Sequence, residues 1–418
     1  PWRAVRGVWA GACPGGPIDL RFSPLPMALN LFNTLTRRVE PFAPIDIHGR
    51  SVGMYCCGPT VHDFAHIGNF KTFVLADLVR RYLEFKGYNV NHVMNVTDVE
   101  DKIIRRVRES GTTLEAYTRR YESAFFEDHQ ALNCLAPGST PRATEYIGEI
   151  ITLIERLQER KLAYVAGDGS VYFSIDKYRG CGCRYGQLLN LNFDQMRPGE
   201  RVANDEYGKE AIADFALWKA RVPEDGEVYW SSPWGEGRPG WHIECSAMSM
   251  KLLGPSFDLH LGGEDLIFPH HEDEIAQSCA HTGEADFARV WMHGEFLTLS
   301  GTKMSKRYGN ILTARDLAEH GVDPGAVRYL ISGTHYRQRL DWTDDALAAA
   351  REGSKALGEL RDRLEAAASP EGSAEFDDAI ERAWGQFRDA MDDDLSAPRA
   401  VGALQLFRSE ANRLLDAG

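Results

Sequence analysis

The fold is decided by residues 52–98, "VGMYCCGPTVHDFAHIGNFKTFVLADLVRRYLEFKGYNVNHVMNVTD". Residues 52–61 are mostly apolar and contain a Gly-Pro turn near their end, which is typical of a short buried strand. Residues 71–88 repeat apolar side chains at a helical period that stops at Gly87, and residues 89–98 alternate as a strand does. A strand, a helix and a strand in this order predict an α/β fold with a parallel sheet, which binds ligands at the carboxyl ends of its strands.

The rest of the chain divides into an interrupted α/β part and a helical end. Residues 100–160 read as helical, and residues 165–215 are irregular apart from short strand candidates such as "SVYFSI". Strand and helix patterns return after about residue 226, and the sequence from about residue 314 onward is helical without strand signals. We therefore expect a disordered upstream extension before Met27, an α/β domain in two halves around an inserted domain, and a helical bundle. The expected boundaries are 1–26, 27–129, 130–225, 226–313 and 314–418, in that order.

The composition indicates a reducing compartment and excludes a membrane span. The 418 residues are 43% apolar, enough for sizeable cores, and no run of about 18 apolar residues occurs. Eight cysteines scattered over a chain of this length do not form a disulfide framework, so we expect a cytoplasmic protein. The formal charge of -14 argues against a surface coated with nucleic-acid contacts, yet it leaves room for a local basic patch.

The segment "PHHEDE" (269–274) carries the spacing of metal ligands. Pro269 suits the first turn of a helix, so His270 and Glu274 should share one helix face. A tetrahedral zinc site would draw two thiolates from elsewhere, and Cys57 and Cys245, expected at the ends of neighbouring strands, are the candidates. The alternative is that the histidine and the glutamate form a surface pair and that the cysteines are buried apolar residues.

Two further segments suit phosphate groups. "HIGN" (66–69) joins a histidine, a glycine and an amide at a strand-to-helix turn, although taken alone it is better explained by Asn69 as the N-cap of a helix starting at Phe70. "GTKMSKRYGN" (301–310) gathers three cations around Ser305, which suits the charge that develops as pyrophosphate leaves. Taken in isolation, each segment is better explained as an ordinary helix cap or a solvated surface loop.

The combination of motifs resembles a known family. "HIGN" after the first strand and "KMSK" after the last are similar to the paired signature of class I aminoacyl-tRNA synthetases. "CGPTVHDFAHIGN", "NVTDVEDKII", "GWHIECSAM", "FPHHEDEIAQS" and "KMSKRYGN", in this order, closely resemble the cysteinyl-tRNA synthetases over nearly the whole chain after the extension. The fold that this resemblance implies is a Rossmann-like parallel sheet split by an insertion and followed by a helical bundle.

The resemblance implies a role for each matching residue. It assigns one Zn2+ per chain to Cys57, Cys245, His270 and Glu274. It also implies that the substrate cysteine binds this metal and lies against Cys57, Thr97 and Trp241. It assigns the ATP phosphates to His66, Asn69 and the loop lysine Lys306, with Lys303 in support. It assigns the adenosine to His260, Gly262, Gly263 and Asp265. The family has a histidine where this chain has Asn69, and an amide cannot carry the same charge.

The implied reaction uses L-cysteine, Mg2+ with ATP, and tRNA(Cys). Cysteine is activated to cysteinyl-adenylate and then transferred to the tRNA, whose acceptor end would touch the insertion and whose anticodon side would touch residues 335–342 and the bundle. We expect a monomer. The family usually continues beyond the point where this chain stops, so the bundle is expected to be truncated or naturally short.

Two other functions stay open at this stage. A tRNA-independent cysteine ligase of the mycothiol-pathway type would activate cysteine in the same way, and a non-catalytic paralogue would bind only nucleotide or tRNA. The intact Glu274 and the "CGPT" spelling favour the synthetase over the ligase, and the intact zinc ligands and loop lysine favour it over the non-catalytic paralogue. Cys181 and Cys183, in "RGCGCRYG", could suggest a second metal site, but incidental thiols in a loop explain them better.

Overall fold

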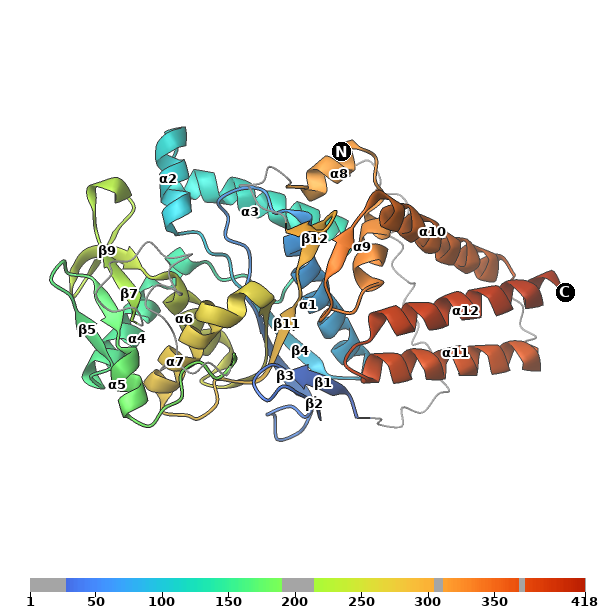
Figure 1. Cartoon of the computed structure of the whole chain (residues 1–418), viewed down its shortest axis with the longest axis horizontal. Helices are drawn as coiled ribbons and strands as arrows, with labels where there is room; N and C mark the ends of the chain where they lie inside the picture. Colours follow the sequence, from blue (N-terminus) through green and yellow to red (C-terminus); the bar gives the residue numbers. More distant parts are fainter. Residues whose placement is uncertain (1–27, 190–213, 304–310, 368–372, 418) are drawn as a thin grey trace.

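The computed structural model describes residues 28–189, 214–303, 311–367 and 373–417. Figure 1 shows an elongated molecule with a parallel sheet at its centre, an inserted α/β lobe at one end and a bundle of long helices at the other. No helix among the described residues is long and apolar enough to cross a membrane.

The central sheet is parallel, as the sequence predicts. Its strands run in the order β11-β10-β3-β4, so segments far apart in the sequence lie next to each other. The first strand–helix–strand unit consists of β3 (Ser51–Cys56), α1 (Ile67–Phe85) and β4 (Asn89–Met94). The second half adds β10 (Phe257–Gly263), α7 (Glu272–Thr282) and β11 (Ala288–Gly294). The carboxyl ends of all four strands therefore meet at one edge of the sheet.

Helix α1 begins earlier than the sequence suggested. Its N-cap is His66, not Asn69, and Asn69 occupies the third helical position instead. The His66 ring accepts from the Asn69 N–H (3.3 Å), and the Asn69 side chain accepts from the His66 N–H (3.1 Å). This reciprocal capping box satisfies two donors that the helix start would leave unpaired, which a lone Asn cap would not do.

The inserted lobe contains its own antiparallel sheet, in the order β5-β6-β7-β9-β8. Its strands reach Pro239, beyond the expected domain boundary at residue 225. The strands are β5 (Ala163–Val165), β6 (Val171–Phe173), β7 (Phe215–Ala220), β8 (Trp230–Ser232) and β9 (Gly235–Pro239). The helices before and within the lobe are α2 (Asp101–Ser110), α3 (Leu114–Ala131), α4 (Ile147–Glu159) and α5 (Ile175–Gly180).

Two local expectations in the second half need correction. Cys245 does not lie at the end of a strand, because it belongs to helix α6 (Trp241–Leu253). The α-helix after Pro269 begins only at Glu272, since Phe268 is extended and a short wide turn spans Ile267–His271. Helix α6 is buried at every position from His242 to Ser249, so its sequence carries no one-sided helical period that would have identified it.

The region from residue 314 onward is mainly helical, but its described part contains a strand, β14, that the sequence did not predict. β14 (Leu340–Trp342) pairs in parallel with β12 (Leu297–Leu299), which also pairs with β13 (Thr302–Lys303). The helices are α8 (Ala314–Glu319), α9 (Pro324–Ser332), α10 (Asp344–Ala366), α11 (Ala374–Asp392) and α12 (Ala397–Asp416), and a hairpin is made by β1 (Asn30–Asn33) and β2 (Arg38–Pro41). A three-residue strand is too short to give a periodic signal.

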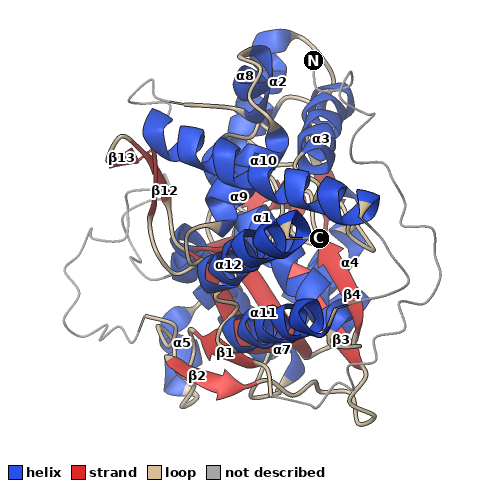
Figure 2. Cartoon of the chain, turned by 90° about the vertical axis from the view of Figure 1, so that its right-hand side faces the viewer, coloured by secondary structure: helices blue, strands red, loops and turns tan. Residues whose placement is uncertain are grey.

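Two apolar cores cover the two faces of the parallel sheet. Cys56 belongs to the core that α1 and the carboxyl-terminal helices share, whereas Cys57 belongs to the core beneath α6. The sequence predicted that Cys56 would pack on the face opposite Cys57, and the two cores confirm it. Figure 2 shows α10, α11 and α12 standing in front of the sheet, so helices cover that end of it.

Candidate functional site

The four predicted metal ligands come together at the carboxyl edge of the sheet. One ligand atom from each of Cys57, Cys245, His270 and Glu274 lies within 4.8 Å of the other three, and all four residues are buried. The sulfur atoms of Cys57 and Cys245 lie 3.8 Å apart. Glu274 Oε1 lies 3.6 Å from the Cys57 sulfur and 3.0 Å from His270 Nε2.

These separations fit a tetrahedral ion. Zinc bonds of about 2.0–2.3 Å in tetrahedral geometry place the ligand atoms roughly 3.3–3.8 Å apart. The Cys57–Cys245 and Cys57–Glu274 separations match that range, and the His270–Glu274 pair is slightly closer. Two thiolates, an imidazole and a carboxylate are also the donor types that zinc prefers. The cluster can therefore hold a metal ion.

A layer of further histidines supports the cluster. His260 Nε2 lies 2.9 Å from Glu274 Oε2, and His271 Nε2 lies 3.3 Å from the Cys57 sulfur. His271 in turn meets His293 through a 2.7 Å contact between ring nitrogens. Cys57, His260, His271 and Glu274 form a second possible ligand set, but it has one thiol in place of two. Partners of this kind fix the orientation of metal ligands and tune their basicity.

Electrostatics inside the cluster favour the metal-binding form of two of the four ligands, the Glu274 carboxylate and the Cys245 thiolate. Burial opposes ionisation of Glu274, but the rings of His260 and His270 outweigh it and lower its pKa to about 2. Burial would lower the pKa of His270, yet Glu274 and Cys245 raise it to about 10. The hydrogen bond from Cys57 lowers the pKa of Cys245 to about 6, whereas burial raises the pKa of Cys57. A divalent cation would replace the protons on Cys57 and His270, because metal ligands must be deprotonated.

The turn after β3 holds Cys57 at the edge of the sheet. Its backbone N–H continues the sheet by donating to the Leu261 carbonyl (3.1 Å). The next residue must be glycine, because a Cβ at Gly58 would collide with the carbonyl oxygen of Asn95. The Asn95 side chain accepts from the Gly58 N–H (2.8 Å) and donates to Thr97 Oγ1 (3.2 Å). The turn that presents the thiol is thus tied to the segment that carries Thr97.

Of the two residues expected to contact the amino acid, Trp241 lies beside the cluster, whereas Thr97 is linked to the Cys57 turn through Asn95. The Trp241 ring stacks on the His270 ring, with centroids 4.4 Å apart. Trp241 keeps partial exposure, while Thr97 is buried at the end of β4. An indole face beside a metal cluster can contact a small amino acid bound there.

His66 and Asn69, which the sequence predicted to face phosphates, lie at the start of α1. The Ile67 N–H donates to the Leu312 carbonyl (2.8 Å), and His66 bridges to Thr313. Leu312 and Thr313 follow residues 304–310, so the "HIGN" turn contacts the chain that leaves the "KMSK" segment. Lys306 lies outside the described residues, and Lys303 is described only as the backbone end of β13.

Lys71 fastens α1 to that region. Its side chain is 3% exposed and donates to three backbone carbonyls, those of Glu295 (2.7 Å), Tyr336 (3.2 Å) and Gln338 (2.7 Å). These carbonyls lie just before β12 and between α9 and β14. A buried ammonium needs such compensation, and in return it fixes the helix against the strand that leads into the "KMSK" segment.

The predicted adenosine residues separate into two groups. Gly262 and Gly263 end β10, and α1 approaches them closely enough that a Cβ at Gly263 would contact Thr72. Asp265 follows on the surface in a short 3-10 turn. His260 does not belong with them, because its ring is fully buried and faces Glu274. It has no surface to offer a nucleotide and instead supports the metal cluster.

Sequence reasoning missed several residues of the site. His271, His293 and Glu244 lie in or around the cluster, and all are buried. The doubled histidine of "PHHEDE" and the histidine that closes β11 were the signals for the first two. The exposed thiols Cys181 and Cys183 join no group of potential metal ligands among the described residues.

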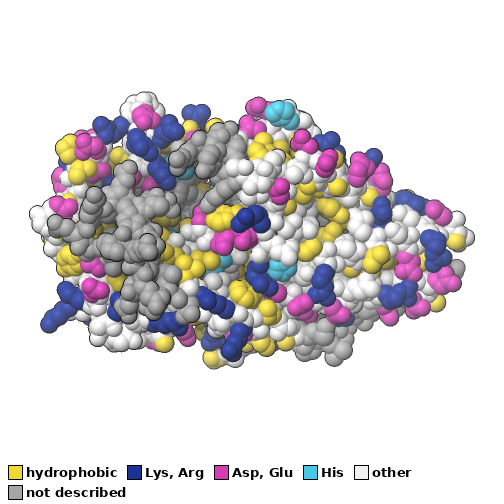
Figure 3. Space-filling view, in the orientation of Figure 1, with side chains coloured by type: hydrophobic (Ala, Val, Ile, Leu, Met, Phe, Trp, Pro, Cys, Tyr) yellow, Lys and Arg dark blue, Asp and Glu magenta, His cyan; other side chains and the backbone are white. Residues whose placement is uncertain are grey.

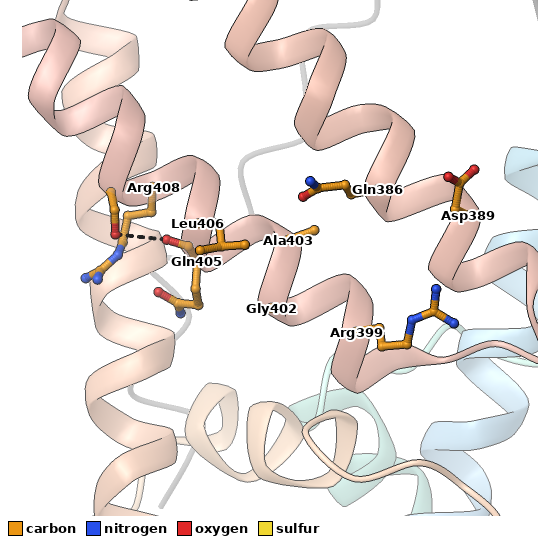
Figure 4. A pocket seen from close by; sticks show the side chains of 9 residues that line it. Gln386, Asp389, Arg399, Gly402, Ala403, Gln405, Leu406 and Arg408 are labelled. Atoms are coloured by element: carbon orange, nitrogen blue, oxygen red, sulfur yellow. Dashed lines mark hydrogen bonds between the residues drawn. The ribbon is translucent and has the colours of Figure 1, made fainter.

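A separate pocket lies in the bundle between α11 and α12 (Figure 4). Its walls mix Asp389, Arg399 and Arg408 with Gln386, Gln405 and Leu406. Figure 1 places this bundle across the sheet from α6 and α7, away from the metal cluster. Basic and acidic side chains are interspersed over the described part of the face in Figure 3.

The fold and this site define a class of protein, the class I tRNA synthetases. The family model described as "tRNA synthetases class I (C) catalytic domain" matches residues 44–352. Methionyl-tRNA synthetase of Mycobacterium tuberculosis, solved with methionyl-adenylate, has a similar fold (TM-score 0.62, 16% identity, 88% of this chain and 84% of that chain). So does the LeuRS–tRNA–LeuAMS complex of Agrobacterium radiobacter K84 (TM-score 0.62, 11% identity, 89% and 81%).

Within that class, the chain belongs to the cysteine–tRNA ligase family. It is 45% identical to the enzyme of that name from Chlamydia muridarum over 393 residues, covering 93% of this chain and 81% of the relative. It is 47% identical to the one from Pectobacterium carotovorum over 387 residues, covering 92% and 80%.

Proposed function

We propose that this chain activates L-cysteine with ATP to cysteinyl-adenylate and transfers the cysteinyl group to the 3′ end of tRNA(Cys). The observation that carries the proposal is the buried Cys57, Cys245, His270 and Glu274 cluster on the same sheet edge as the "HIGN" turn. This reaction needs a group that binds the thiol of cysteine and groups that bind the phosphates of ATP, at the same edge of the sheet. The names of the relatives support the same assignment.

Zn2+ is the ion that we assign to the cluster. When bound there, zinc supplies a Lewis acid that takes a thiolate far better than a serine hydroxyl, whose proton is held much more tightly. Pocket size alone separates similar small side chains by only about 10- to 200-fold, so selection by chemical type explains rejection of serine better. The four side chains hold the ion, while His260 and His271 orient Glu274 and Cys57.

The other residues position the substrates. Thr97 and Trp241 would contact the amino acid, and Gly262, Gly263 and Asp265 would border the adenosine. His66 and Asn69, with Lys306 and Lys303, would meet the phosphates of ATP, which arrives with Mg2+. The cysteine carboxylate attacks the α-phosphorus and pyrophosphate leaves; the terminal ribose hydroxyl of the tRNA then attacks the acyl carbon of the cysteinyl-adenylate, and AMP leaves. Positioning and charge stabilisation dominate in such a reaction.

A tRNA-charging assay tests the proposal against the two alternative functions. Purified protein should form cysteinyl-tRNA from cysteine, ATP and tRNA(Cys). Ligation of cysteine to glucosaminyl-inositol without tRNA charging would overturn the assignment in favour of the mycothiol-pathway type of ligase. Absence of cysteine-dependent ATP–pyrophosphate exchange would favour a non-catalytic paralogue. We further propose that the protein is cytoplasmic and monomeric. Gel filtration at micromolar concentration tests the monomeric state.

A further inference from the structure

Asn95 is a buried amide that connects two parts of the site. It directly follows β4, is 1% exposed, and uses both ends of its side chain. Its Oδ1 accepts from the Gly58 N–H (2.8 Å), and its Nδ2 donates to Thr97 Oγ1 (3.2 Å). One side chain therefore links the turn that carries the metal ligand Cys57 to the hydroxyl expected to contact the amino acid.

The orientation of this amide is fixed by its surroundings. A backbone N–H can only donate, so the Asn95 side-chain oxygen must face Gly58 and the NH2 group must face Thr97. The two segments fit closely, because a Cβ at Gly58 would collide with the Asn95 carbonyl oxygen. The Thr97 hydroxyl must then accept from Asn95, which restricts the directions left for its own O–H bond and its second lone pair.

The backbone of Thr97 is held by the chain that follows Cys57. The Thr97 N–H donates to the Pro59 carbonyl (3.0 Å), and the Thr97 carbonyl accepts from the Val61 N–H (3.1 Å). Among the described residues, Asn95 is the only group that hydrogen-bonds to the Thr97 hydroxyl. Backbone bonds thus hold the chain at Thr97, and the bond from Asn95 directs its hydroxyl.

We propose that Asn95 is a positioning residue for cysteine binding, which directs the Thr97 hydroxyl and holds the Cys57 turn beside it. This inference rests on the proposed function, because that function takes the amino acid to contact Cys57 and Thr97. A hydroxyl that turns freely loses rotational freedom when the substrate arrives, whereas one already held by Asn95 does not. Asn95 therefore raises the affinity for cysteine without touching it.

Asn95→Asp separates the two hydrogen bonds. A carboxylate still accepts from the Gly58 N–H but has no N–H for Thr97, so the hydroxyl must turn and donate to the carboxylate. Isothermal titration calorimetry on zinc-loaded protein should show cysteine binding weakened roughly 3- to 10-fold, the range that one neutral hydrogen bond gives. ATP affinity and zinc content should stay within about twofold of the wild type, because the bond to Gly58 remains.

A double-mutant cycle distinguishes the direction of the hydroxyl from a general effect of the added charge. Thr97→Val removes the hydroxyl and should weaken cysteine binding to the same extent, whereas Thr97→Ser should retain most of the affinity. In the Thr97→Val background, Asn95→Asp should cause no further loss, because no hydroxyl is left to direct. A purely structural role of Asn95 would give the same loss in both backgrounds.

Three results would overturn the proposal: wild-type cysteine affinity in Asn95→Asp, wild-type affinity in Thr97→Val, or equal losses from Asn95→Asp in both backgrounds. Where Asn95→Asp does not fold, Asn95→Ser replaces it in the same cycle, since it also lacks the donor but adds no charge. The proposed function is tested separately by tRNA charging. Protein that shows the expected cycle but charges no tRNA would keep the role of Asn95 and overturn the function, and protein that binds no cysteine would overturn both.

Discussion

The sulfur atoms of Cys57 and Cys245 lie 3.8 Å apart, although 188 positions separate the two residues in the sequence. One sulfur follows the strand β3 and the other lies in the first turns of α6, across the whole inserted lobe. The two halves of the parallel sheet must therefore assemble before the site exists. The metal cluster can stabilise that assembly, because an ion that binds only the folded state adds its binding energy to folding.

Cys57→Ser should remove most of the bound zinc and abolish cysteine-dependent pyrophosphate exchange. A hydroxyl is a much poorer zinc ligand than a thiolate, and Cys57 contributes one of only two sulfurs. Cys56→Ala is the matched control, because Cys56 is equally buried but packs in the opposite core. Zinc content and exchange rate would be measured on both variants. Normal zinc in Cys57→Ser would contradict the ligand assignment.

His260→Phe should lower zinc affinity by about 10- to 100-fold while the protein stays folded. The ring keeps its contacts with Trp291, on which His260 stacks at 4.3 Å, but Glu274 loses its 2.9 Å partner. Competition with a chelator measures the affinity, and His320→Phe on the surface controls for the change in ring type. An unchanged affinity would mean that Glu274 needs no support.

Lys306→Ala should reduce pyrophosphate exchange by about 100-fold or more, in line with loss of a transition-state contact. The resemblance to the family assigns Lys306 to the phosphates, and this residue lies outside the described part of the structure. Zinc content should not change. Arg307→Ala is the neighbouring control and should retain most of the activity; equal losses in both variants would point to general loop charge instead.

Lys71→Met should lower the free energy of unfolding by about 3 kcal/mol, because three backbone carbonyls lose their buried donor. Lys71→Arg keeps a cation and several donors, so it should recover much of the loss. Urea unfolding followed by tryptophan fluorescence gives both values. A change below about 0.5 kcal/mol in Lys71→Met would show that water replaces the ammonium at little cost.

His92 should make the fold sensitive to acid. Burial lowers its pKa to about 3, and neither ring nitrogen has a partner among the described residues. The folded state therefore binds fewer protons than the unfolded state between pH 3 and 6.5, and stability falls as pH falls through that window. Between pH 7 and pH 5 the loss is roughly 2 kcal/mol. His92→Leu should remove this part of the pH dependence, which unfolding curves at both pH values would reveal.

The sequence predicted the parallel sheet from strong local periodicity, whereas the four metal ligands were singled out by their chemistry together with the resemblance to the synthetase family. The β3–α1–β4 unit follows from periodicity, and the pairing of His270 with Glu274 follows from a spacing of four residues. Four chemically matched ligands drawn from three motifs left little freedom in the site. Most of the α/β order could be read in the same way.

The features that the sequence did not predict depend on contacts between distant segments. The role of His260 depends on Glu274 reaching it from another element, and the burial of Glu244 depends on α6 packing against the parallel sheet. His66, not Asn69, is the N-cap because the two residues form a capping box together. The residue preference used for the sequence prediction considers the N-cap residue alone. The strand β14 exists only through pairing with β12.

Zinc per chain in exchange-active protein is the most direct test of the central claim, that a metal cluster selects cysteine at this sheet edge. Inductively coupled plasma mass spectrometry on a preparation with measured cysteine-dependent exchange should find about one zinc per chain. Removing the ion with a chelator should remove the exchange, and added zinc should restore it. Full cysteine-dependent exchange by protein that contains essentially no zinc or other metal would contradict the account.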